Sequence, residues 1–446
     1  MRILFIVPYV PTPIRVRPYN LIKNLVARGH RLTLATLWSS PGERQALAEL
    51  EALGVRLLTA SLPRWRSLFN CLAALPGPLP LQAVYCRSRP LRLAIERELV
   101  DRSTPHTKDS NHALSDLRVL RGFNYDVVHV EHLRGTYYGL GLEGVRVVWD
   151  SVDCISHLFE QAARDSGSLS GRLMTRLDLA RTRRYEGWLV GQFARVLVTS
   201  RTDALALEEL ALQEGSLNQA EGNGRGHLSG AGQPIVVLPN GVDLEYFRAA
   251  PPLMRVPDTL VMTGKMSYHA NVTAALYLVH RVMPLVWRVR PQVKVILAGA
   301  NPPASVWRLA AEFPGKVQVT GQVPDLRPYL YRAAVAVAPV RYGAGIQNKV
   351  LEAMACGAPV VATPQACTAL QTVAGQDLLV GQDSTELARA VLSLLSDPEL
   401  AARLGAAGRR YVERHHDWHV VAAYLEDIYR EVSFQRRAHR EPQGFQ

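Results

Sequence analysis

The segment Ala334 to Thr363 reads AVAVAPVRYGAGIQNKVLEAMACGAPVVAT, which predicts a buried strand, a glycine loop, a short helix and a second buried strand. Gly343 and Gly345 allow a tight turn and let a ligand approach the backbone N–H groups of the loop. The helix that begins near Asn348 directs its positive end at the same place. Together these features predict a binding site for an anion.

Two charged side chains of that helix favour a phosphate ligand that also carries a diol. Lys349 lies in the first turn, where the helix dipole disfavours a cation, so a nearby phosphate would explain it. Glu352 is the only acid of the helix, among Val350, Leu351 and Met354, and a carboxylate there is costly unless it finds donors such as the hydroxyls of a ribose. The alternative is a plain strand-to-helix turn with one solvated glutamate.

A second loop carries a basic residue that suits the same ligand. Lys265 follows Gly264 at the end of the predicted strand TLVMTG, where a cation can stabilise the charge that develops on a departing diphosphate. A surface lysine at a turn is the alternative interpretation. His269 and Asn271 lie in the same loop, and Asn271 is equally consistent with a helix N-cap.

Strand ends in the first half of the chain carry a second set of polar residues. His129, Glu131 and His132 lie at or near the carboxyl end of the strand YDVVHV, and Asp150 and Asp153 lie at the end of VRVVWD. Ligands of parallel sheets bind beyond the carboxyl ends of the strands, so these side chains are expected to face a substrate. A histidine at a strand end is also a common structural residue.

Buried strands alternate with helices along the whole chain, which predicts parallel sheet. The first half contains RILFIV, RLTLATL, VRLL, YDVVHV, VRVVWD and ARVLVTS, and the second half restarts with IVVLP, TLVMTG, VKVILAG, KVQVTG, AAVAVAPV, APVVAT and DLLV. We therefore expect an α/β fold of two doubly wound, Rossmann-like domains that face a central cleft.

A polar, glycine-rich stretch at 211–233 marks the expected domain boundary. We expect an N-terminal domain at 1–233 that includes this stretch as a flexible insertion, a C-terminal domain at 234–417, and a last helix with a tail at 418–446. The last helix is predicted to pack back on the first domain, because one face is apolar. The residues of that face are Val420, Tyr424, Leu425 and Ile428.

The composition describes a folded, basic chain. Its 446 residues are 48% hydrophobic and 20% charged, with a net charge of +12, which fits two buried cores and favours anionic partners. Five scattered cysteines lack disulfide or zinc spacing, and no Asp-x-Asp motif or His/carboxylate cluster has metal-ligand spacing, so we expect a cytoplasmic protein with no required metal. The short apolar N-terminus, which ends in prolines, is read as a strand rather than a signal peptide.

Three motifs resemble those of a known family. VLPNGVDLEYF, TGKMSYHANV and LEAMACGAPVVAT are similar to segments of the retaining GT-B nucleotide-sugar glycosyltransferases of family four, the glycosyl transferases group 1. The form GAGIQNKVLEAMA is nearest to sugar transferases of exopolysaccharide and PEP-CTERM systems. The resemblance implies a hexosyltransferase of polysaccharide biosynthesis. It would use a UDP- or GDP-sugar donor, need no cofactor, and transfer to a glycan or lipid-linked acceptor with retention of anomeric configuration.

The resemblance also implies roles for particular residues. Gln322 and Val323 match the position whose backbone meets the nucleobase, and Glu352 matches the glutamate assigned to the ribose. A second family glutamate, eight residues earlier, is replaced by Ala344, so no side chain is assigned to the donor sugar. The implied donor-binding residues are Gly264, Lys265, Gln322, Val323, Gly343, Gly345, Ile346, Gln347, Asn348, Lys349 and Glu352. The candidate catalytic residues are His132, Asp150, Asp153 and Lys265.

The first domain is expected to hold the acceptor. Its loop PYVPTPIRVRPYN carries Arg15 and Arg17, two cations that suit a lipid-linked pyrophosphate. The segment around Trp65 and Phe69 and the Arg-rich helix that holds Trp188 each fit two interpretations. One is peripheral contact with an anionic membrane at its inner face, and the other is a covered apolar patch with a solvated charged face.

Three other functions are alternatives. A nucleotide-sugar epimerase or hydrolase on the same fold would consume donor without an acceptor, but the chain has no well-placed acid/base set. A catalytically silent nucleotide-sugar-binding protein would bind donor without transfer, and Ala344 in place of a glutamate favours it. Nucleic-acid binding is the weakest alternative, because the basic residues come without an aromatic stacking platform, and we expect no nucleic-acid partner.

Overall fold

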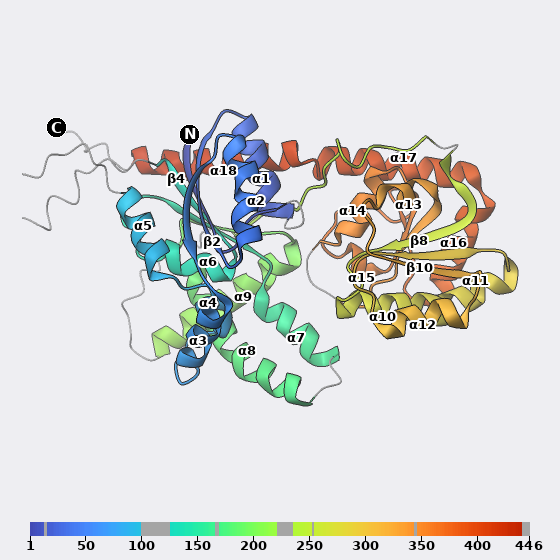
Figure 1. Ribbon diagram of the computed structural model, residues 1–446, viewed down its shortest axis with the longest axis horizontal. Helices are drawn as coiled ribbons and strands as arrows, with labels where there is room; N and C mark the ends of the chain where they lie inside the picture. Colours follow the sequence, from blue (N-terminus) through green and yellow to red (C-terminus); the bar gives the residue numbers. More distant parts are fainter. Residues whose placement is uncertain are drawn as a thin grey trace, which may run out of the picture. The chain divides into compact units, whose positions relative to one another are not determined.

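The chain forms two parallel sheets with helices around them (Figure 1). The computed structural model describes residues 1–12, 16–99, 125–165, 169–220, 235–251, 254–342 and 346–438. The chain divides into unit 1, Met1–Leu238 with Ala422–Gln446, and unit 2, Pro239–Val421. Of the predicted features, Arg15, Gly343, Gly345 and positions 221–233 of the insertion lie outside the described residues.

Unit 1 contains a seven-stranded parallel sheet in the order β3-β2-β1-β4-β5-β6-β7. Its strands are apolar on both faces, as strands covered by helices on each side must be, and Ile3 to Val7 are all fully buried. The strands are β1 (Arg2–Val7), β2 (Arg31–Trp38), β3 (Arg56–Ser61), β4 (Val127–Glu131), β5 (Val147–Val152), β6 (Arg195–Val198) and β7 (Ile235–Val237). The helices are α1 (Val16–Ala27), α2 (Pro41–Ala52), α3 (Arg64–Ala74), α4 (Leu81–Tyr85), α5 (Arg89–Leu99), α6 (His132–Gly139), α7 (Ile155–Asp165), α8 (Leu169–Val190) and α9 (Arg201–Ala220).

Unit 2 contains a six-stranded parallel sheet in the order β10-β9-β8-β11-β12-β13. The strands are β8 (Val256–Thr263), β9 (Lys294–Ala298), β10 (Val317–Gly321), β11 (Ala333–Ala338), β12 (Val360–Ala362) and β13 (Leu379–Val380). The helices are α10 (His269–Tyr277), α11 (Met283–Val289), α12 (Ala304–Glu312), α13 (Arg327–Arg332), α14 (Asn348–Ala355), α15 (Pro364–Cys367), α16 (Ser384–Ser396) and α17 (Pro398–His415), and a π-helical turn (Leu278–Val282) joins α10 to α11.

The strands of unit 2 separate two hydrophobic cores by the period-two alternation of their side chains. Leu260 and Met262 of β8 pack with α10, α11, α12 and α16, whereas Val261 between them packs with α13, α14 and α17. Figure 1 shows α10 and α12 on one side of this sheet and α13 and α14 on the other. The two doubly wound sheets confirm the predicted α/β class.

Two details near the expected boundary differ from the sequence-based expectation. β7, which we placed at the start of the second domain, pairs with β6 as the last strand of the first sheet, because the chain leaves that sheet only after Leu238, whose N–H donates to the Val198 carbonyl. The first ten positions of the expected insertion continue helix α9 to Ala220. Their composition, rich in Ala, Leu, Gln and Glu, favours helix.

Helix α18 (Trp418–Ala438) begins in unit 2 and continues in unit 1. The predicted apolar face was partly wrong, because Val420 and Tyr424 are 43% and 44% exposed. The buried face is shifted around the helix. It consists of Val421, Leu425, Ile428, Tyr429 and Val432. An ion pair of 2.6 Å between Glu426 and Arg28 joins α18 to the segment after α1.

Candidate functional site

The candidate site of unit 2 lies where the strand order of the sheet reverses. From β8 the chain proceeds outward through β9 to β10, and from β11 it proceeds outward the other way through β12 to β13. The loops that follow β8 and β11 therefore leave neighbouring strands in opposite directions. Such a switch point is where open parallel sheets bind ligands.

The loop after β8 is built from glycine because two backbones meet there. Gly264 and Gly299 have φ of +144° and +153°, and a Cβ on Gly299 would lie 1.8 Å from the Gly264 carbonyl oxygen. The Asn271 amide donates a 3.0 Å hydrogen bond to the Lys265 carbonyl, while Tyr268 holds the N-cap position of α10. Asn271 therefore fixes the loop and does not cap the helix. Lys265 itself is exposed.

The same loop touches the helix that follows β11. A Cβ on Gly264 would lie 3.4 Å from Cε of Lys349, so the two predicted donor-binding residues are brought together. Tyr342 strengthens this contact, because its hydroxyl lies 3.0 Å from Nδ1 of His269 and 3.1 Å from Oγ1 of Thr273. Its ring also stacks on the imidazole of His269 with an interplanar angle of 15°. Sequence reasoning missed Tyr342, whose only signal is its place beside the glycine loop.

Lys349 and Glu352 carry the electrostatics of the site. They lie three residues apart on α14 and so on the same side of the helix. Burial lowers the pKa of Lys349 to about 8, and burial raises the pKa of Glu352 to about 6 against the opposing effect of Lys349. Nζ of Lys349 donates to Oε1 of Gln347 at 3.0 Å, whereas the Glu352 carboxylate makes no hydrogen bond or ion pair within the described part of the chain.

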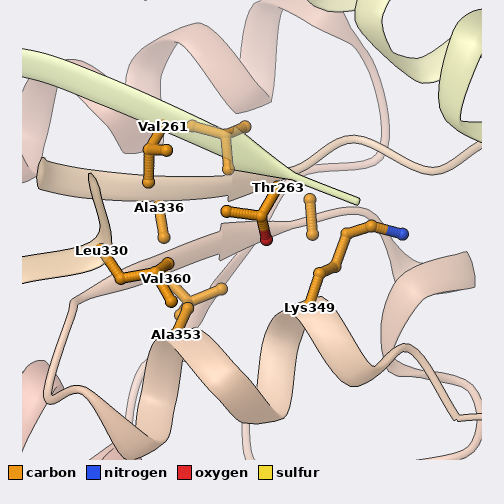
Figure 2. Close-up of a pocket in the computed structure, with 9 residues that line it drawn as sticks. Val261, Thr263, Leu330, Ala336, Lys349, Ala353 and Val360 are labelled. Carbon is orange, nitrogen blue, oxygen red and sulfur yellow. The ribbon is translucent and has the colours of Figure 1, made fainter. Parts of the chain in front are cut away.

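Figure 2 shows how Lys349 is held. Its aliphatic stem lines a small, mainly apolar cavity under α14, together with Thr263 of β8, and its ammonium points away from that cavity. The stem is thus held among apolar side chains, and burial of the whole side chain lowers the pKa of its ammonium. The other lining residues are Val261, Leu330, Ala336, Val337, Ala338, Ala353 and Val360.

The remaining predicted donor residues lie at the same edge of the sheet. Ile346 is buried, Gln347 is the N-cap residue of α14, and Asn348 is its exposed first residue. Gln322 and Val323 follow β10, two strands from β8, which corresponds to about 10 Å at a strand spacing of about 4.8 Å. That separation suits a ligand with a diphosphate at one end and a base at the other.

Trp307 is an aromatic residue that sequence reasoning missed. A Cβ on Gly321 would lie 3.6 Å from its indole ring, which places the ring beside the Gln322 loop. The side chain is 47% exposed, an unusual state for so large an apolar group. Only the tertiary structure brings α12 beside the end of β10, so the sequence held no signal for it.

The switch point of unit 1 lies between β1 and β4, and its predicted residues mostly pair with one another. Arg17, predicted to meet the acceptor, is in α1 and 5% exposed. Its Nε donates to Oδ2 of Asp150 at 2.9 Å, and its Nη2 donates to the Leu238 carbonyl at 3.1 Å. Asp150 is fully buried. We expected both side chains to face a substrate, but they are buried and form an ion pair with each other.

His129 and Glu131 also have internal partners. Nδ1 of His129 lies 2.8 Å from the Tyr429 hydroxyl of α18, and its ring stacks on Phe5 at 4.0 Å. Burial and the Arg17 guanidinium hold the pKa of His129 well below its usual value, so the imidazole is neutral. Tyr9 donates a 2.8 Å hydrogen bond to Glu131.

His132 and Asp153 are the candidates of unit 1 that stay partly exposed. His132 and Val152 have φ of 64° and 69°, a left-handed backbone that is costly for residues other than glycine and tends to occur at functional sites. Burial and Arg134 lower the pKa of His132 to about 3. Burial and Asp203 raise the pKa of Asp153 to about 6, a value suited to proton transfer near neutral pH.

The described residues lack both a metal site and a membrane-spanning helix. They contain no group of three or more His, Cys, Asp or Glu side chains placed to hold a metal ion. No helix among them is both long and apolar enough to cross a membrane.

The loops after β8 and β11 fall within a segment that matches a known family. Residues 257–397 match the family described as Glycosyl transferases group 1. Over 213 residues the chain is 28% identical to the GDP-mannose-dependent monoacylated alpha-(1-6)-phosphatidylinositol monomannoside mannosyltransferase of Corynebacterium glutamicum, which covers 43% of this chain and 55% of that protein. It is 26% identical over 296 residues to the glycogen synthase of Mycobacterium tuberculosis, with 64% of this chain and 63% of that protein covered. The chain thus spans less than two thirds of either relative.

Solved structures extend the likeness over nearly the whole chain. HepE of Anabaena in complex with UDP-glucose superposes with a TM-score of 0.61 at 13% identity, covering 97% of this chain and 100% of that one. Sucrose-phosphate synthase of Thermosynechococcus elongatus superposes with a TM-score of 0.59 at 18% identity, covering 98% of this chain and 100% of that one. The chain has the GT-B fold. The fold predicted from the sequence is therefore confirmed.

Proposed function

We propose that this GT-B protein is a glycosyltransferase that takes a sugar from a nucleoside-diphosphate-sugar donor, with unit 2 as its donor-binding domain. The observation that carries the proposal is the pair Lys349 and Glu352 at the switch point. A diphosphate would stabilise the charged form of the lysine, whose pKa is lowered. A ribose diol would supply the hydrogen-bond donors that the half-buried carboxylate lacks within the described residues. Lys265, exposed in the loop after β8, is proposed to contact the same diphosphate.

The names of similar proteins support this class of donor. The Corynebacterium relative is described as GDP-mannose-dependent, and the Anabaena structure contains UDP-glucose. We propose that the base lies near Gln322 and Val323 with the ring of Trp307 beside it. UDP- and GDP-sugars both fit this arrangement, because backbone groups and an aromatic face do not select strongly between bases.

We propose further that unit 1 binds the acceptor and that transfer retains the anomeric configuration. Asp153 and His132 are the residues proposed to approach the reacting centre, since Asp150 is occupied by Arg17. A lipid-linked acceptor is supported by the names of the Mycolicibacterium smegmatis and Corynebacterium relatives, a phosphatidyl-myo-inositol mannosyltransferase and a phosphatidylinositol monomannoside mannosyltransferase. We propose that it is met at the cytoplasmic face of a membrane. NMR spectroscopy of the anomeric proton in the product tests retention.

Glu352→Ala tests the donor site. Loss of two charge-assisted hydrogen bonds, worth about 3 kcal/mol, weakens binding of the correct nucleotide sugar by about 100-fold, measured by calorimetry against UDP- and GDP-sugars. Glu413→Ala, an exposed acid on α17, is the matched control and leaves affinity unchanged. Unchanged binding of both nucleotide classes by Glu352→Ala contradicts the assignment.

A transfer assay separates an enzyme from a silent binding protein. The donor identified by calorimetry is incubated with membrane extract and the wild-type chain, and incorporation of labelled sugar is measured. Transfer supports the enzyme. Donor consumption without any acceptor favours an epimerase or hydrolase, and binding without consumption or transfer favours the silent protein.

A further inference from the structure

Helix α3 of unit 1 exposes an apolar stripe. Trp65, Leu68, Phe69 and Leu72 are 65%, 59%, 63% and 64% exposed, and at about 100° per residue they fall on one face. Ser67 is the only residue of the helix that is buried. Surface helices of globular proteins usually bury such a stripe, whereas α3 exposes its apolar face to solvent. Figure 1 shows α3 beside α4 at the lower edge of unit 1.

Helix α3 and the sequence on either side of it carry only positive charges. Positions 52–95 contain no Asp or Glu, and they contain six arginines at 56, 64, 66, 87, 89 and 92. Arg64 and Arg66 are exposed, and their guanidinium groups make no hydrogen bond or ion pair with any described residue. On the helical projection they flank the apolar stripe on opposite sides. An apolar stripe between free cations complements an anionic lipid surface, where the stripe enters the acyl boundary and the cations meet phosphates.

The described arginines of helix α8 do not share this property. Arg181 donates to the Leu75 carbonyl at 2.7 Å, Arg183 pairs with Glu160, and Arg184 lies 3.6 Å from Glu214. These charges are therefore used within the protein. Of the two basic, aromatic segments that the sequence singled out, the contacts favour α3.

We propose that α3 docks unit 1 on an anionic membrane, with Trp65, Leu68, Phe69 and Leu72 inserted and Arg64 and Arg66 at the headgroups. The biological role of this docking rests on the proposed function, because an enzyme that acts on a lipid-linked acceptor must meet it at the bilayer. The physical interaction does not depend on the donor, so the two proposals are tested separately.

Vesicle co-sedimentation of the full chain without nucleotide tests the docking. Wild type is expected to bind vesicles of phosphatidylcholine with about 30% phosphatidylglycerol about tenfold better than pure phosphatidylcholine vesicles. Trp65→Ser/Phe69→Ser removes most of this binding. Arg64→Glu/Arg66→Glu removes the preference for the anionic lipid. Wild type that stays in the supernatant, or shows no preference for the anionic vesicles, overturns the proposal.

Two controls isolate the effect of α3. Leu212→Ser removes an apolar side chain of α9 that is 73% exposed, and it is expected to bind vesicles as wild type does. Thermal unfolding shows that the α3 variants remain folded, and calorimetry shows unchanged nucleotide binding, since α3 belongs to the other unit. Sedimentation velocity tests self-association: a wild-type dimer that Trp65→Ser/Phe69→Ser converts to monomer assigns the stripe to a second copy and overturns the membrane proposal.

Discussion

The two switch points of the chain differ in where their charges find partners. At β1 and β4 of unit 1, the Arg17 guanidinium binds the buried Asp150 carboxylate, and Tyr9 binds Glu131. At β8 and β11 of unit 2, Nζ of Lys349 donates to the neutral amide of Gln347, and no described side chain binds the Glu352 carboxylate.

We interpret this difference as separating residues that hold the fold from residues that we propose to bind a ligand. A buried charge without a partner is expensive, so a folded protein either pairs it internally or keeps it where a ligand completes the pair. The charges of unit 1 are therefore expected to control stability. Those of unit 2 are expected to control binding.

Arg17→Ala is expected to give the largest effect. It removes the cation that pairs with the fully buried Asp150 carboxylate and lowers the free energy of unfolding by about 3–5 kcal/mol, measured by urea denaturation. Arg31→Ala, at an exposed position of β2, is the control and changes stability by less than about 0.5 kcal/mol. Equal stabilities of the two variants would remove the contrast between the units.

Lys349→Met tests whether the charges of unit 2 control ligand binding. It keeps the stem that lines the cavity in Figure 2 and removes the charge, so stability changes little. Loss of a charge-assisted contact of about 2 kcal/mol weakens nucleotide-sugar binding by about 30-fold in calorimetry. Lys294→Met serves as control, because Lys294 begins β9 and so lies at the edge of the sheet opposite to the site. A large loss of stability without loss of affinity would make Lys349 a structural residue.

The pH dependence of donor affinity sharpens the assignment. Below about pH 6 Glu352 gains a proton and can no longer accept two hydrogen bonds, and above about pH 8 Lys349 loses the charge that attracts the diphosphate. Affinity for a nucleotide sugar is therefore expected to peak between these values, and a slope of up to about tenfold per pH unit is expected on each side. Glu352→Gln abolishes the acid limb and Lys349→Met the alkaline limb. A flat profile in wild type contradicts both roles.

Trp307→Ala is expected to have the smallest effect. Loss of stacking against the base costs about 1 kcal/mol, or about fivefold in affinity for the nucleotide, and leaves binding of inorganic pyrophosphate unchanged. Calorimetry with the two ligands separates these outcomes. An equal loss for both ligands would mean that the variant disturbs the phosphate loops instead.

The local hydrophobic pattern of the sequence was sufficient to predict most of the strands and helices. The apolar runs from β1 to β13 and the helix after the glycine loop appear in the sequence because a parallel strand must be apolar on both faces and a helix must begin after a turn. The pattern was less informative at polar or ambiguous positions. The buried face of α18 was misplaced at Val420 and Tyr424, since its apolar residues fit two overlapping faces and only packing chose one.

The sequence by itself determined the α/β alternation, and it was sufficient to propose Lys349 and Glu352 as a site, because residue type and spacing along one short helix are local properties. The tertiary structure decided which charges are free. Arg17 and Asp150 are 133 residues apart, and Trp307 meets Gly321 only because strand order places β10 beside α12. A partner distant in sequence leaves no local pattern, so pairing between elements follows from the fold alone.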